Sequence, residues 1–127
     1  MARVLIVEDD ADLAQLVSRR LRDYGHNVAI APSARLAMSV VGIDFPVDVV
    51  LLDVHLPGMD GFELLEELRR HPELDRPDLP AVFLSGSADP DNQERAQRLG
   101  CTFLNKPFVS GELQGALLQA LGASGAS

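Results

Sequence analysis

The sequence predicts an α/β fold with a doubly wound parallel sheet of five strands and five helices. Two observations predict it. Short apolar runs alternate with segments whose apolar residues recur at helical spacing along the 127-residue chain, and this alternation is typical of parallel sheets covered by helices. The apolar runs also lack a polar residue at every second position, which indicates strands that are buried on both faces.

The expected strands are short runs of β-branched and other apolar residues. They cover residues 4–7, 28–31, 47–52, 81–84 and 102–104. The stretch DVVLLD, residues 48–53, shows the pattern most clearly, because four apolar residues are followed at once by a carboxylate. A buried strand that ends on an acid raises the question of what that acid does.

The first three helices follow the first three strands. The first is expected at residues 11–24 and stops at Gly25, because glycine commonly ends helices. The second opens at Pro32-Ser33 and closes at Gly42. The apolar anchors of the first helix are Leu13, Leu16, Val17, Leu21 and Tyr24, and those of the third are Phe62, Leu65 and Leu68.

The fourth helix, residues 91–99, is expected to be weakly anchored. It begins after Asp89-Pro90, because Asp is a good N-cap and Pro suits the first helical position. Its apolar residues are Ala96 and Leu99, which predicts a segment that shifts easily. The fifth helix, residues 110–121, has one apolar face. We therefore expect one domain of residues 1–121, then a flexible tail or the start of a linker at 122–127.

The composition excludes several classes of function. With 19 acidic and 11 basic residues and a net charge of −8, the chain lacks the basic footprint needed for direct binding of nucleic acid. It has one cysteine, Cys101, so no internal disulfide can form, as is typical of a reducing compartment. No signal sequence precedes Val4, and no apolar stretch reaches about 18 residues. We therefore expect a cytoplasmic protein without a membrane segment.

Polar residues follow four of the five expected strands. Ligands of doubly wound sheets bind outside the carboxyl ends of the strands, where this chain has Glu8, Asp9, Asp10, Asp53, Ser85 and Lys106. Two like charges about 4 Å apart repel by on the order of 4 kcal/mol at an effective dielectric near 20. Crowded carboxylates must therefore protonate, spread apart or share a cation. The oxygen donors Glu8, Asp9 and Asp53 suit Mg²⁺.

Each of these residues has a simpler explanation when it is taken alone. Asp10 is an acid at a helix N-terminus, where acids are favoured. Asp53 resembles a turn-forming Asp, Ser85 resembles ordinary loop polarity, and Lys106 resembles a solvated charge before a rigid turn. Their coincidence at one edge of the predicted sheet favours a functional site.

Four segments carry a resemblance to a known family. VLIVEDD, VVLLDVHLPGMDGFELL, VFLSG and FLNKPF occur in this order, and together they resemble the receiver domain of two-component response regulators over about residues 3–121. The resemblance implies a flavodoxin-like sheet with the strand order 2-1-3-4-5. It also implies that Asp53 accepts a phosphoryl group, that Asp9 binds Mg²⁺ directly, and that Glu8 holds a metal-bound water.

Further roles are implied by the same resemblance. The backbone carbonyl of His55 would be another metal ligand. Ser85 would hydrogen-bond the phosphoryl group, and Lys106 would pair with it. Phe103 occupies the position of the switch aromatic, which in this family is often Tyr. His55 and Ser87 flank the site, whereas His26 and His71 are expected in a loop and at a helix end.

The resemblance implies a phosphoryl-accepting switch rather than an enzyme that turns over an external substrate. The donor would be a phosphohistidine of a sensor histidine kinase or a histidine phosphotransfer domain, docked on the helix at 11–24. The face made by residues 91–99, 102–104 and 110–121 would change and meet an output protein or domain. A dimer that forms on phosphorylation is a further expected assembly.

Several alternatives compete with this interpretation. The domain could be a phosphorelay intermediate or a fragment of a hybrid kinase. A phosphatase of the haloacid dehalogenase type needs a second acid two residues after the nucleophile, where this chain has His55. A flavodoxin-like cofactor binder needs a phosphate cradle after the first strand, where Glu8-Asp9-Asp10 would repel phosphate. A degenerate receiver, serving as an interaction module alone, would not need the full set of site residues.

Overall fold

The computed structural model describes residues 2–41, 45–86 and 89–125. Its five strands form one sheet in the order β2-β1-β3-β4-β5, and every neighbouring pair is parallel. The predicted fold class and strand order are therefore confirmed. The elements are β1 (Arg3–Val7), α1 (Ala11–Asp23), β2 (Asn27–Ala31), α2 (Ala34–Val40), β3 (Val49–Asp53), α3 (Gly61–Arg69), β4 (Ala81–Ser85), α4 (Pro90–Arg98), β5 (Thr102–Asn105) and α5 (Ser110–Gly125).

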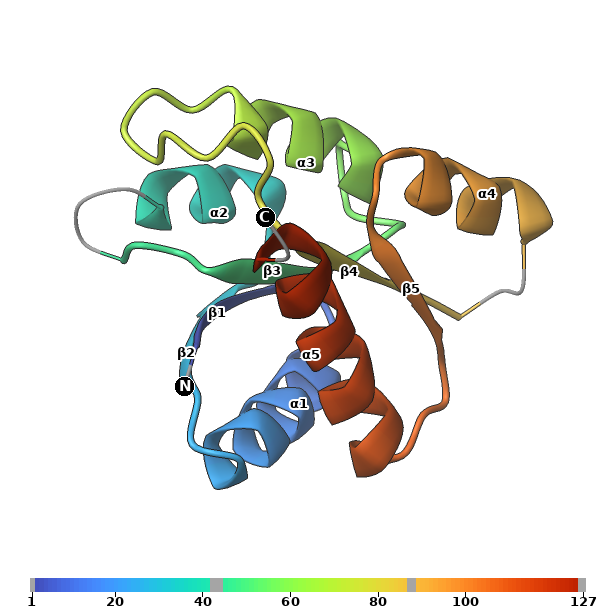
Figure 1. The fold of residues 1–127 in the computed structure, drawn as a ribbon. Coiled ribbons are helices and arrows are strands. Elements are labelled where there is room, and N and C mark those ends of the chain that lie inside the picture. The colour runs from blue at the N-terminus through green and yellow to red at the C-terminus, as the bar shows by residue number, and fades with distance from the viewer. Residues whose placement is uncertain (1, 42–44, 87–88, 126–127) are drawn as a thin grey trace.

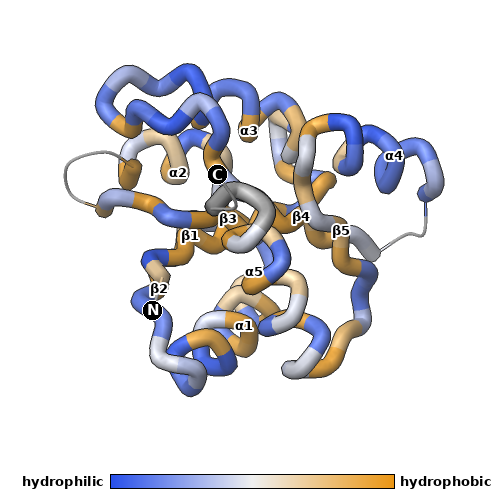
Figure 2. Tube along the Cα trace, viewed as in Figure 1, coloured by the Kyte–Doolittle hydropathy of each residue, from blue (hydrophilic) through white to orange (hydrophobic). Residues whose placement is uncertain are grey.

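The sheet lies between two layers of helices (Figure 1). Helices α2, α3 and α4 cover one face, and α1 and α5 cover the other. In β1, Leu5 and Val7 join the core under α2, α3 and α4, whereas Val4 and Ile6 join the core under α1 and α5. Because each face has its own hydrophobic core, the strands are apolar at consecutive positions between their polar end residues, and Figure 2 shows them as mainly hydrophobic.

The helices begin at the capping residues that the sequence provides. The carboxylate of Asp10 accepts a hydrogen bond from the Leu13 amide at 3.2 Å, and Asp89 accepts one from the Asp91 amide at 2.9 Å. Asp60 caps α3 in the same way. At the end of α1, Gly25 has φ of 92°, a left-handed conformation that favours glycine. The predicted starts of α1 and α4, and the stop after α1, are therefore confirmed.

The expected apolar anchors of α1 are partly wrong. Leu16 is 46% exposed and Tyr24 is 47% exposed, whereas Ala14, Val17 and Leu21 are buried against the sheet. These three residues lie at spacings of three and four, so they form a stripe narrower than the five predicted anchors. Helix α1 consequently presents a large apolar side chain, Leu16, to solvent.

Several predicted boundaries shift by one residue, and those of β3 and α5 differ by more. Strand β3 begins at Val49 rather than Val47, although Val47 is buried. Helix α5 continues to Gly125, beyond the expected end at Leu121, because helical hydrogen bonding extends past the last residue that packs on the core. Residues 126–127 and Gly42 lie outside the described residues, and the domain boundary at 121 stays a prediction.

Within the described ranges, no helix combines the length and apolarity that crossing a bilayer requires.

One polar group in the core has a consequence for stability. The hydroxyl of Ser18 is buried against the sheet and has no hydrogen-bond partner among the described residues. Ser18→Ala should raise the free energy of unfolding by about 1 kcal/mol, because a buried unsatisfied polar group costs on that order. Urea denaturation measures the change. The matched control is Ser39→Ala on the exposed side of α2, and equal effects of both variants would contradict the prediction.

Candidate functional site

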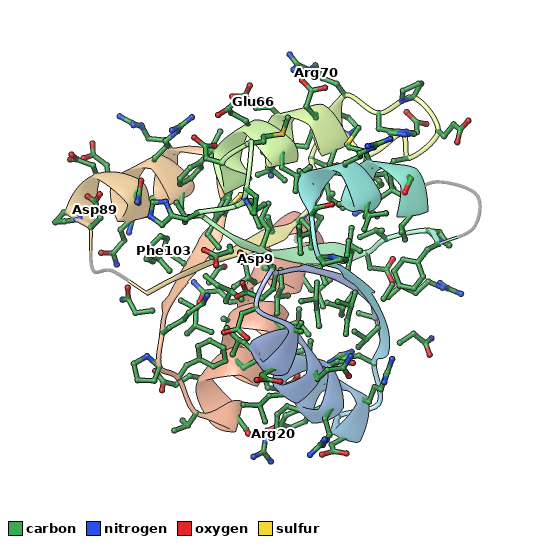
Figure 3. The ribbon with its side chains drawn as sticks, turned by 180° about the vertical axis from the view of Figure 1, so that it is seen from behind. Asp9, Arg20, Glu66, Arg70, Asp89 and Phe103 are labelled. Atoms are coloured by element: carbon green, nitrogen blue, oxygen red, sulfur yellow. The ribbon has the colours of Figure 1, made fainter. Side chains whose placement is uncertain are left out.

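The carboxyl ends of β1, β3, β4 and β5 bring the predicted residues together. One carboxylate oxygen each from Glu8, Asp9 and Asp53 lies within 4.8 Å of the other two. The ammonium nitrogen of Lys106 lies 2.7 Å from Glu8 Oε1 and 3.0 Å from Asp53 Oδ2. Figure 3 shows Asp9 at this edge, between the two helical layers. The cluster predicted from the strand ends is therefore present.

Asp53 is held at the end of a strand that is buried on both faces. Asp53 pairs in register with Leu84 of β4, and it is 7% exposed. Its Oδ1 accepts a hydrogen bond from the His55 amide at 3.0 Å, so the turn-forming geometry considered for Asp53 coexists with its place in the cluster. One carboxylate oxygen thus contacts the backbone of the next turn, and the other contacts Lys106.

Gly61 supports Asp53 from the start of α3, and sequence reasoning missed it. Its amide donates a hydrogen bond to the Val54 carbonyl at 2.8 Å. A Cβ at position 61 would overlap the backbone carbonyl oxygen of Asp53 and lie 3.2 Å from the Val54 Cα. Any side chain here would therefore displace the end of β3. The available signal was a glycine directly after the N-cap Asp60, where other residues form helices better.

Glu8 is buried at the site and pairs with Lys106, which is partly buried. Glu8 is 2% exposed. Burial raises the pKa of its carboxyl group; the hydrogen bond from Lys106 opposes this rise, and the nearby Asp53 carboxylate adds to it. Burial by itself lowers the pKa of Lys106, but its hydrogen bonds to Glu8 and Asp53 outweigh burial, so the net pKa is raised. Lys106 therefore stays charged and offsets part of the carboxylate repulsion.

The two neighbouring acids after β1 have different surroundings. Asp9 is exposed and belongs to the carboxylate cluster. Asp10 caps α1 through its side chain, and its amide donates to Glu8 Oε2 at 3.3 Å. The sequence predicted this division, because Asp10 was better explained as an acid at a helix N-terminus.

The remaining predicted residues lie around the cluster. Ser85 is the buried last residue of β4, and its carbonyl accepts the Lys106 amide at 2.7 Å. Phe103 pairs in register with Phe83 and packs, half-buried, against the core under α2, α3 and α4; Figure 3 labels its side chain. The side chain of His55 is exposed, and the metal-ligand role of its carbonyl stays a prediction. Ser87 lies outside the described residues.

His26 is more deeply embedded than its expected place in a loop. It is buried at the edge of β2, where Nδ1 accepts a hydrogen bond from the Ala2 amide at 3.0 Å. Its Nε2 lies 3.2 Å from Oε1 of Gln114 in α5. No local pattern signals this contact, because Gln114 is 88 positions away along the chain.

The donor set fits a divalent cation of the Mg²⁺ type. Three carboxylates converge from two adjacent strand ends, and all their ligand atoms are oxygen, which Mg²⁺ prefers. The single ammonium group of Lys106 leaves the cluster with excess negative charge. A divalent cation held by Glu8, Asp9 and Asp53 would offset that excess.

An acidic cluster and a lysine lie at the carboxyl ends of the strands of a doubly wound sheet, which is where such folds bind ligands. These groups can bind a cation and an anion at one site. The family described as response regulator receiver domain matches residues 4–118. The chain belongs to this family. Receiver domains are signalling domains that interact with kinases and output domains, bind Mg²⁺ at an acidic pocket and turn over no external substrate. The haloacid dehalogenase and flavodoxin alternatives are thereby set aside.

Proteins similar to this chain differ in length. The chemotaxis protein CheY4 of Vibrio cholerae is 31% identical, with a TM-score of 0.83 over 95% of this chain and 99% of that chain. An uncharacterized 14.6 kDa protein of Leptolyngbya boryana is 36% identical over 87% of this chain and 82% of its own length. The C4-dicarboxylate transport transcriptional regulatory protein DctD of Pseudomonas aeruginosa is 35% identical over 94% of this chain.

Several of the curated relatives are much longer than this chain. The chain spans 25% of DctD and 23% of a probable cyclic di-GMP phosphodiesterase of Vibrio cholerae. In those proteins the similar region is therefore one part of a larger molecule.

The raised pKa of Glu8 predicts a pH-dependent effect on stability. Glu8→Gln should raise the melting temperature of the metal-free protein at neutral pH by a few degrees, because the folded state disfavours the charged carboxyl group. The gain should shrink as pH falls through the raised pKa, because wild-type Glu8 is then protonated too. Thermal unfolding between pH 7 and pH 4 measures it.

The matched control is Glu66→Gln, since Glu66 is exposed on α3, on the outer side in Figure 3. It should leave the melting temperature nearly unchanged. A Glu8→Gln variant that is less stable than the wild type at neutral pH would contradict the expected sign.

Proposed function

We propose that the chain is a phosphoryl-accepting switch of a two-component system and that Asp53 takes the phosphoryl group from a phosphohistidine. The observation that carries this proposal is the shared ammonium group of Lys106, 3.0 Å from Asp53 Oδ2 and 2.7 Å from Glu8 Oε1. An acceptor carboxylate, a cation and further oxygen donors are the groups that phosphoryl transfer needs.

Each site residue has a proposed role. Asp9 and Asp53 would bind Mg²⁺ through their carboxylates, Glu8 would hold a metal-bound water, and the His55 carbonyl would complete the protein's share of ligands. Mg²⁺ supplies positive charge that offsets the charge on the phosphoryl oxygens. The 4.8 Å grouping of the three carboxylates supports this ligand set.

The proposed transfer is a displacement at phosphorus. A carboxylate oxygen of Asp53 forms a bond to phosphorus while the phosphorus–nitrogen bond of the phosphohistidine breaks, and the imidazole leaves with the electron pair. The transition state is loose and its charge lies on three equatorial oxygens, so positioning and charge neutralisation supply most of the catalysis. Lys106 pairs with one of these oxygens, and the Ser85 hydroxyl donates a hydrogen bond to another.

The buried strand β3 explains why an acid stands at its end. Both faces of β3 pack on hydrophobic cores, and Gly61 closes the backbone tightly against Asp53. The acceptor is therefore held in one position, which lowers the entropic part of the barrier.

Phosphorylation adds roughly −1.5 to −2 charge at Asp53. Ser85 would then move toward the phosphoryl group, and Phe103 would turn into the space it leaves. Reversing a 1:99 equilibrium to 99:1 requires about 5.5 kcal/mol, and two or three charge-assisted hydrogen bonds of about 1.5–3 kcal/mol each are of that size. We propose that the changed face is α4, β5 and α5, where an output protein, an output domain or a second copy binds.

The phosphoryl donor would dock beside α1. The exposed Leu16 borders a surface groove of about 260 Å³ whose lining includes Arg20, Phe108 and Val109. A neighbouring hollow of about 400 Å³ includes Leu16, Phe108 and Lys106. This apolar path ends at the site, which supports docking of a histidine kinase or histidine phosphotransfer domain there, in the cytoplasm.

A role as a relay element within a longer protein is the second candidate. It is favoured by the length of relatives such as DctD, of which this chain spans 25%. The two roles share the chemistry at Asp53. They differ in whether phosphorylated Asp53 returns its phosphoryl group to a histidine phosphotransfer domain.

Acetyl phosphate tests the identity of the acceptor. With Mg²⁺, the wild type should gain one phosphoryl group by intact mass, and Asp53→Asn should gain none, because an amide is not a nucleophile here. The matched control is Asp60→Asn, since Asn also caps a helix and Asp60 lies at the start of α3. Modification of Asp53→Asn at the wild-type rate would refute the assignment.

Mg²⁺ titration separates the two acids that follow β1. Asp9→Ala should weaken Mg²⁺ binding by about tenfold or more, as expected for lost metal-site residues. Asp10→Ala should retain the affinity and cost about 1 kcal/mol of stability through the lost N-cap. Equal losses of affinity in the two variants would show that the proposed ligand is misplaced by one residue.

A further inference from the structure

Helix α4 is held by unusually little apolar contact. Figure 2 shows it as a mainly hydrophilic segment, and among its described residues Ala96 is the buried one. The guanidinium carbon of Arg95 lies 4.4 Å from the centre of the Phe62 ring in α3. This cation–π contact therefore supplies a substantial part of what fixes α4 against its neighbour.

The Phe62 ring beneath Arg95 packs against Phe83 of β4, the strand that ends at the site. Phe62 is buried, and its ring centre lies 4.4 Å from that of Phe83 at a tilt of 30°. Phe83 belongs to β4, two residues before Ser85, and pairs in register with Phe103 of β5. The contacts of Arg95 with Phe62 and of Phe62 with Phe83 thus link α4 to the strand that ends at Ser85, next to Phe103 in the sheet.

The C-terminal end of α4 is tethered differently. Arg69 donates hydrogen bonds to the carbonyls of Leu99 at 3.3 Å and Leu79 at 2.8 Å. The Cys101 amide donates to the Ala96 carbonyl at 2.9 Å. These backbone contacts fix the end of the helix next to β5. The Arg95 contact is separate from them, and a side chain on a helix reaches toward the N-terminus of that helix.

We propose that Arg95 is a positioning residue that holds α4 in its unphosphorylated place through Phe62 and thereby limits activation at Asp53. The inference rests on the proposed function of Asp53. If the contact exists in the unphosphorylated arrangement and is lost in the other, it biases the equilibrium between them by its own free energy. For a half-buried cation–π pair that bias is about fivefold.

Helix α4 contains its own control residue. Arg98 lies on the same helix, and its pairing with Glu94 at 3.7 Å joins two exposed side chains. Such a pair contributes little. Arg95→Met and Arg98→Met therefore make the same chemical change, and they differ in whether an aromatic ring is lost as a partner. Arg95→Lys keeps a cation and should lie between Arg95→Met and the wild type.

Amide hydrogen exchange of the full chain, without metal or phosphoryl group, measures how often α4 opens locally and therefore how firmly it is anchored. Arg95→Met should speed exchange of the α4 amides about fivefold, and Arg98→Met should not. Phe62→Leu removes the ring but keeps an apolar residue. In that background Arg95→Met should have no further effect on α4, because the partner is already gone.

The affinity for beryllofluoride in the presence of Mg²⁺ measures the effect of Arg95 on the equilibrium between the unphosphorylated and the activated arrangement. Arg95→Met should bind this phosphoryl mimic more tightly, up to about fivefold, and Arg98→Met should match the wild type. Tighter binding is the result that a merely structural role would not produce, because general destabilisation of the fold cannot raise affinity.

Three results would overturn the proposal or its basis. If exchange in α4 is equal for Arg95→Met and Arg98→Met, Arg95 does not anchor the helix. Faster exchange across the whole domain with unchanged or weaker beryllofluoride binding would refute the role in switching. A wild-type chain that binds no beryllofluoride would refute the proposed function and the effect on Asp53, while exchange in α4 would still decide the anchoring role.

Discussion

Two buried carboxylates share a single ammonium group at the edge of this sheet, and a third carboxylate lies beside them. Glu8 and Asp53 both contact Lys106, and Asp9 adds a third negative group within 4.8 Å. Burial works against the charged form of Glu8, so the arrangement holds together because the surrounding backbone does not yield. The two hydrophobic cores, the close approach of Gly61 and the cap at Asp10 all serve to keep these charges in place.

The same constraint divides the molecule into a firm part and a movable part. Strands β1, β3 and β4 are buried on both faces, so Asp53 and the acids after β1 cannot drift apart to relieve their repulsion. Helix α4, in contrast, rests on Ala96, on Arg69 at its far end and on the cation–π contact of Arg95. In the proposed function, a change of charge at Asp53 would be expressed where anchoring is weakest, at the edge formed by β4, β5 and α4.

Helices α1 and α4 are anchored differently, and the proposed function uses them differently. Helix α1 packs firmly through Ala14, Val17 and Leu21, yet it presents Leu16 beside Lys106 and Phe108. These features support the proposed docking of a phosphoryl donor at α1. Membership of the receiver family is consistent with this division, since such a domain must admit a phosphoryl donor at one surface and signal from another.

The sequence by itself determined what depends on neighbours along the chain. Uninterrupted apolar runs marked the strands, the capping acids marked the starts of helices, and polar residues at strand ends identified Glu8, Asp9, Asp53 and Lys106. Only the tertiary structure decided which face of α1 is buried, that His26 meets Gln114, that Gly61 leaves no room for a side chain, and that Arg95 covers Phe62. These outcomes depend on distances between elements remote in the chain, and periodicity and capping patterns contain no information about such distances.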